Sequence, residues 1–110
     1  MDELVEKLSA GEHPVVVTLR PERTAAALKK RIDEHGFVHI RFTGTRGGTE
    51  LGVTLDDRSN WGDADFEQGK GRITLSGRLQ LNYVPVRCVA NIDLGTLEGL
   101  GHLEPIEAAV

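Results

Sequence analysis

The segment GRITLSGRLQLNYVPVRCVANIDL, residues 71–94, decides the fold, because its hydrophobic pattern changes parity in the middle. Apolar positions are odd from Ile73 to Leu81 and even from Val84 to Ile92. A two-residue turn at Asn82-Tyr83 explains this change, since it folds two strands onto each other with all apolar positions on one face. The predicted pairs are Leu81–Val84, Leu79–Val86, Gly77–Cys88, Leu75–Ala90 and Ile73–Ile92. A bulge in one long bent strand is the alternative, because Asn-Tyr is a weaker turn signal than Asn-Gly.

The same pairing places Arg78 directly across from Arg87 on the outer face of the hairpin. Like charges that face each other on a sheet cost up to ~1 kcal/mol unless an anion or a carboxylate lies between them. An anionic ligand could supply that countercharge. Carboxylates of the same chain are the preferred source, because structural ion pairs are commoner than binding sites. The candidates are Asp93, Glu98 and the acidic segment at residues 56–67.

A second hairpin is expected in RFTGTRGGTELGVTLDD, residues 41–57. These glycines do not form a phosphate-binding loop, because no Lys follows them and the next residues alternate like a strand. With Gly47-Gly48 at the centre of a type I′ turn, every apolar residue falls on one face. The resulting apolar-face pairs are Gly44–Leu51, Phe42–Val53 and Ile40–Leu55. On the other face His39 lies across from Asp56, either as an oriented general base or, as we prefer, as a solvated cross-strand pair.

The N-terminal third predicts two helices and one strand. Residues 2–9 carry a short amphipathic helix, and residues 14–20 form an apolar, β-branched strand. From residue 22 to 35 apolar side chains recur at spacings of three and four, and Gly36 then ends the helix. This order of strand, helix and strand predicts a crossover unit, in which two strands of the same sheet would be parallel or nearly so. The predicted fold is therefore α+β: a mainly antiparallel sheet of about five strands, built from two hairpins, with the crossover helix packed on one face.

Residues 56–71, DDRSNWGDADFEQGKG, form a long loop that combines acidic and aromatic residues. The spacing superficially resembles a calcium loop, but non-ligand residues occupy its key positions, so no metal site is expected. Trp61 and Phe66 either dock on the core or serve as a hot spot for a basic partner surface, together with Asp63 and Asp65.

The C-terminal segment, residues 94–110, has an apolar residue at every third position from Leu94 to Ile106, but its glycines and Pro105 oppose a helix. We expect an extended tail that lies across the body of the protein or across a partner. Leu100 and Leu103 are the candidate contact residues of this tail.

Composition limits the class of protein. A chain of 110 residues with 39% hydrophobic residues suits one globular domain. The formal net charge of −4 and the absence of a basic face argue against nucleic-acid binding. No stretch approaches the ~20 apolar residues of a membrane span, and the acidic N-terminus is unlike a secretory signal. The single cysteine, Cys88, reads as a core residue in a reducing compartment, so we expect a cytoplasmic protein.

No set of residues in the sequence predicts catalysis or a cofactor. The sequence therefore favours a small non-catalytic accessory subunit or interaction module. Its partner is a second protein or another copy of the chain, bound through the acidic loop and the tail. The alternative is a binding protein or enzyme for a small anionic metabolite. In that case Arg78 and Arg87 hold the anion, with His39 and Asp56 nearby.

Overall fold

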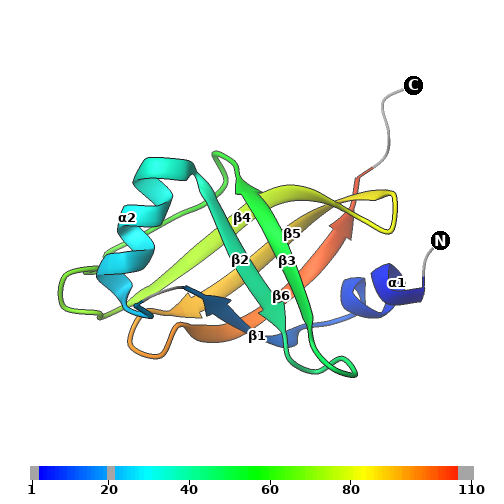
Figure 1. The fold of residues 1–110 in the computed structure, drawn as a ribbon, viewed down its shortest axis with the longest axis horizontal. Helices are drawn as coiled ribbons and strands as arrows, with labels where there is room; N and C mark the ends of the chain where they lie inside the picture. The colour runs from blue at the N-terminus through cyan, green and yellow to red at the C-terminus, as the bar shows by residue number, and fades with distance from the viewer. Residues whose placement is uncertain (1–2, 20–21, 107–110) are drawn as a thin grey trace.

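The computed structural model describes residues 3–19 and 22–106, and its strands form a closed antiparallel barrel (Figure 1). The strands follow the chain order around the barrel, and the last one pairs with the first. The strands are β1 (His13–Thr18), β2 (Phe37–Phe42), β3 (Thr49–Leu55), β4 (Arg72–Leu81), β5 (Val84–Asp93) and β6 (Glu98–Pro105). The helices are α1 (Glu3–Ser9) and α2 (Ala25–His35).

The prediction of an α+β sheet with a crossover helix is wrong. β1 and β2 are antiparallel neighbours, with Val15 across from Phe42, so α2 is an insertion between two adjacent strands. The helix itself lies close to where it was expected. Its N-cap is Thr24, whose Oγ1 accepts a hydrogen bond from the Ala27 N–H at 3.1 Å, and Gly36 ends it with φ of 60°. An order of strand, helix and strand does not specify whether the two strands are parallel. Here the connection that contains α2 places β2 antiparallel to β1.

The hairpin of β4 and β5 is confirmed pair by pair. Leu81 faces Val84, and the register continues without a bulge to Arg72 and Asp93. Asn82 and Tyr83 have φ of 50° and 69°, which is the left-handed conformation that both central residues of a type I′ turn require. The alternative of one bent strand is therefore excluded.

The hairpin of β2 and β3 has the predicted faces but the wrong register. Phe42 pairs with Thr49 rather than with Val53, four residues earlier than expected. An even shift leaves each side chain on its predicted face. The Thr43 N–H bonds to the Pro14 carbonyl instead of β3, and Thr45 bonds to Thr49 through their hydroxyls at 2.7 Å. These bonds make the connection longer than a two-residue turn.

Residues 98–105 of the segment expected as a tail form the strand that closes the barrel. β6 pairs with β5 on one side and with β1 on the other. Gly99 allows this close approach, because a Cβ atom there would collide with the backbone carbonyl of Asn91. Residues 107–110 of the expected tail lie outside the described residues.

Inward-facing side chains fill the interior of the barrel. All six strands contribute, as expected for a small barrel, and α1 and α2 add Leu8 and Leu28 to the same core. The strand members of this core are Val15, Val17, Val38, Ile40, Phe42, Leu51, Val53, Ile73, Leu75, Val86, Cys88, Ala90, Ile92 and Leu103. Neither described helix is long and apolar enough to cross a lipid bilayer. Functional groups of the described chain therefore lie on the outside of the barrel and in its connections.

Candidate functional site

The acidic loop, residues 56–71, is tied to the edge of β4. β3 pairs with β4 only at Thr54 and Leu55. The loop then continues along β4, with Asp56 N–H bonded to the Ser76 carbonyl at 2.9 Å and Asn60 bridged to Thr74. Nearer its end, Asp65 and Lys70 exchange two backbone hydrogen bonds of 2.8 and 3.0 Å. The first part of the loop is therefore hydrogen-bonded to β4, and the last part to itself.

Trp61 and Phe66 contact each other within this loop. Their ring centroids are 5.8 Å apart and their planes cross at 82°, an edge-to-face arrangement that aromatic pairs favour. Both side chains are half-buried and pack against the hydrophobic core. Part of each ring remains exposed, so docking on the core and contact with a partner are compatible.

Acidic side chains and a groove lie next to this aromatic pair. Asp63 and Asp65 are exposed, and the Asp65 carboxylate accepts a hydrogen bond from the Gln68 N–H at 3.0 Å. A groove of about 400 Å³ lies between Phe66 and α2. Its remaining lining residues are Ala26, Lys29, Lys30, Asp33, Glu34 and Glu67.

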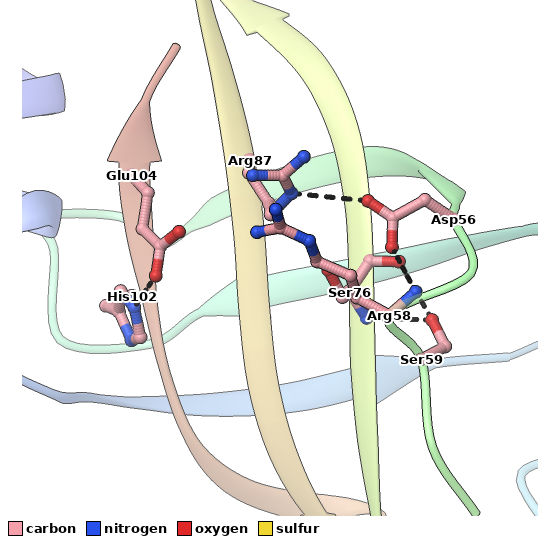
Figure 2. Close-up of polar contacts among 7 residues, drawn as sticks. All are labelled: Asp56, Arg58, Ser59, Ser76, Arg87, His102 and Glu104. Carbon is pink, nitrogen blue, oxygen red and sulfur yellow. Dashed lines mark hydrogen bonds and ion pairs between the residues drawn. The ribbon is translucent and has the colours of Figure 1, made fainter.

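A second cluster of polar residues lies on the outer face of β4 and β5 (Figure 2). Arg78 faces Arg87 across the two strands, as predicted. Nε of Arg87 lies 3.3 Å from Oδ2 of Asp56, and both side chains are largely shielded from solvent. The acidic loop thus supplies a countercharge to Arg87 from within the chain, as the preferred interpretation of the arginine pair expected.

Hydrogen bonds and the charge of Arg87 lower the pKa of the Asp56 carboxylate. Burial by itself raises its pKa, but three groups and the positive charge of Arg87 outweigh burial and lower the pKa below its usual value. The Arg58 backbone N–H donates to Oδ1 at 3.0 Å, and Arg87 donates to Oδ2. The buried Ser76 hydroxyl makes no hydrogen bond of full geometry, yet it faces the same carboxylate and favours its charged form. Asp56 is therefore ionised at neutral pH.

His102 is a feature of this face that the sequence did not indicate. Its Nε2 lies 2.9 Å from Oε2 of Glu104. Its Nδ1 lies 2.9 Å from Oε1 of Glu12, close enough for an ion pair but not aligned for a hydrogen bond. His102 thereby links β6 to the connection between α1 and β1. An alternating pattern in residues 98–105 would have shown His102 and Glu104 on one face, had this segment been read as a strand.

The expected pair of His39 and Asp56 does not form. His39 faces Gly52, and its ring packs edge-on against Phe37 with centroids 5.1 Å apart. Asp56 lies beyond the end of β3, at the β4 side of the barrel. The corrected register of β2 and β3 is what separates them.

The two leucines expected on the tail lie in different environments. Leu103 is 1% exposed and forms part of the barrel interior, so it is unavailable to a partner of the folded chain. Leu100 points outward and is 50% exposed. The most exposed large hydrophobic residue of the described chain is Tyr83, at the tip of the β4–β5 turn.

The Thr18 hydroxyl donates a hydrogen bond to Oε1 of Glu50 at 2.9 Å, but no histidine ring of the described residues bonds to a hydroxyl or a thiol. Every hydrogen bond or ion pair of a histidine ring in this part of the chain goes to a carboxylate or a backbone carbonyl. Burial raises the pKa of the Cys88 thiol to about 12, so no reactive thiolate forms there. No group of three or more potential metal ligands was found among the described residues.

The sequence matches no protein-family model and no curated protein.

Proposed function

We propose that this protein is a small non-catalytic interaction module that binds a protein partner through its acidic loop. The observation that carries the proposal is the Trp61–Phe66 pair, held half-exposed on a loop that is hydrogen-bonded to β4. A loop already fixed in place loses little conformational entropy on binding. Aromatic side chains are the commonest hot spots of protein interfaces.

The closed barrel favours binding through loops rather than through a strand edge. Every described strand has a paired neighbour on both sides, although β3 and β4 pair only at Thr54 and Leu55, so free strand edges are confined to short stretches such as this one. Recognition then depends on side chains that project from the connections. Among these connections the acidic loop combines aromatic surface, charge and an adjoining groove.

The charges of the loop indicate the chemistry of the partner. Asp63, Asp65 and Glu67 are exposed around the aromatic pair. Arg58 and Lys70 are the basic residues of the loop, and the Arg58 side chain extends across β4 toward Arg87 (Figure 2). A basic segment with one large apolar side chain complements this surface, with the apolar group in the groove beside Phe66.

The test compares capture of partners by the tagged protein and by two variants. Trp61→Ala removes the larger ring, and truncation of a hot spot weakens binding by about 10-fold or more. Asp63→Lys reverses an exposed charge without touching the core, so it weakens binding while leaving the melting temperature unchanged. Both variants should lose a partner that the wild type retains in stoichiometric amount.

Tyr83→Ala is the matched control, because it removes an exposed aromatic ring from a distant turn. It should retain the partner fully. Unchanged capture by both Trp61→Ala and Asp63→Lys would refute the proposal.

A further inference from the structure

We propose that Arg58, Arg78 and Arg87 form a binding site for a phosphate group, free or carried by a small metabolite, on the outer face of β4 and β5. This site is separate from the proposed partner surface of the acidic loop, and neither proposal depends on the other.

The register of the strands places two of the arginines together. Arg78 and Arg87 are direct cross-strand partners. Cβ atoms of such partners lie about 5 Å apart, so the two guanidinium groups can reach a common ligand. Thr54 is the neighbour of Arg78 on β3, and it adds no negative charge.

Arg58 points toward the same place. Its backbone lies in the acidic loop, where its N–H holds the Asp56 carboxylate. Its side chain extends across β4 in the direction of Arg87 (Figure 2). The Arg58 side chain therefore extends toward Arg87, and Arg78 is the cross-strand partner of Arg87 on the same face of the sheet.

The nearby carboxylates neutralise this area only in part. Asp56 contacts Nε of Arg87, and the terminal nitrogens of that guanidinium point away from Asp56 and remain able to donate (Figure 2). Glu104 is the neighbour of Arg87 on β6, but its carboxylate bonds to His102. Among the described residues, the side chain of Arg78 has no ion pair or hydrogen bond. Three positive charges thus face two carboxylates, Asp56 bonded to Arg87 and Glu104 bonded to His102, in a protein whose net charge is −4.

A phosphate group fits this arrangement better than other anions. A guanidinium group donates two parallel hydrogen bonds to two oxygens of a tetrahedral anion. Several guanidinium groups can bind different oxygens of one phosphate and together balance its double negative charge. Asp56 orients Arg87 through Nε and leaves its outer fork for the ligand. A nucleic acid fits less well, because the overall charge is negative.

The experiment is calorimetric titration of the full chain with inorganic phosphate and, separately, with glycerol 3-phosphate, at constant ionic strength. We expect saturable binding by the wild type. Arg78→Gln and Arg58→Gln should each weaken it about 10-fold or more, since each removes a charge-assisted contact. Neither exposed side chain contributes to the core, so both variants should melt like the wild type.

Arg46→Gln is the control, because it removes the same charge from an exposed arginine in the β2–β3 connection. It should bind like the wild type. Tighter binding of the ester identifies a metabolite as the ligand, and equal binding identifies the phosphate group alone. The proposal is overturned if the wild type does not bind either compound at about 10 mM, or if Arg46→Gln weakens binding as much as Arg78→Gln.

Discussion

Asp56 is a single residue that connects the acidic loop to the arginines on the outer face of β4 and β5. It begins the acidic loop, bonds to β4 through its backbone, and holds Arg87 through its side chain. The sequence suggested Asp56 as a partner for His39, and the structure assigns it to Arg87 instead. The residue type was informative, because a carboxylate beside two facing arginines was expected, but the partner depended on the register of β2 and β3.

The pH dependence of stability follows from the lowered pKa of Asp56. Because the folded-state pKa lies below the usual value of 3.8, the ionised carboxylate stabilises the fold above that value. This contribution is lost as the pH falls through the folded-state pKa. Asp56→Asn should therefore lower the free energy of unfolding at pH 7 by about 2 kcal/mol, and by much less at strongly acidic pH.

Urea titrations at both pH values measure this difference. Asp57→Asn is the control, because its side chain is exposed and it lies next in the chain. If the two variants have equal stability at pH 7, the stabilising role of the Asp56–Arg87 pair is disproved.

Cys88 provides a second residue-scale prediction. Its thiol is buried and its pKa is about 12, so the folded protein should react with an aromatic disulfide reagent only when the barrel opens. The labelling rate in increasing denaturant should follow global unfolding as monitored by circular dichroism. Rapid labelling of the native protein would show that the β4–β5 face opens locally.

At the scale of elements, hairpins differed in how well their sequences specified them. The β4–β5 pairing was predictable because the change of parity allows only one short turn. The β2–β3 turn was misplaced because Thr43 and Thr45 bond outside the hairpin ladder. β6 was missed because glycines reduce its strand propensity, although Gly99 is what allows β6 to lie against β5.

Replacement of Tyr83 by Gly should stabilise the β4–β5 hairpin. Tyr83 has φ of 69° and a fully projecting side chain, so its conformation is strained without compensating contacts. Left-handed backbone costs a non-glycine residue about 1–2 kcal/mol, of which the greater flexibility of glycine in the unfolded chain cancels part. The net gain should be about 0.5–1 kcal/mol in denaturant titration, and Tyr83→Ala should show no such gain.

Gly99→Ala should disrupt the closure of the barrel. The added methyl group would collide with the Asn91 carbonyl, and overpacking against backbone costs about 3 kcal/mol. Gly44→Ala is a suitable comparison, because a Cβ there meets only Pro14 at an ordinary contact distance of 3.7 Å. A thermal melt of Gly99→Ala that matches that of Gly44→Ala would contradict the tight β5–β6 contact.

At the scale of the whole molecule, closure makes the two ends of the chain interdependent. β1 pairs with β6, and the contact of Glu12 with His102 reinforces the same junction. Amides that join β1 and β6 should therefore exchange with solvent as slowly as those that join β4 and β5. Native-state hydrogen exchange measures this, and fast exchange confined to β6 would indicate an open sheet with a loosely attached C-terminal strand.

The sequence by itself determined which side chains of β2 to β5 face inward, because strand alternation and the change of parity at residues 82–83 depend only on local geometry. It also determined that a helix ends at Gly36 and that Arg78 pairs with Arg87. Only the tertiary structure decided that the sheet closes, that β1 and β2 are antiparallel, and which groups surround Asp56 and His102. Closure and partner choice depend on contacts between residues far apart in the chain, and local patterns do not encode which distant strand completes a sheet.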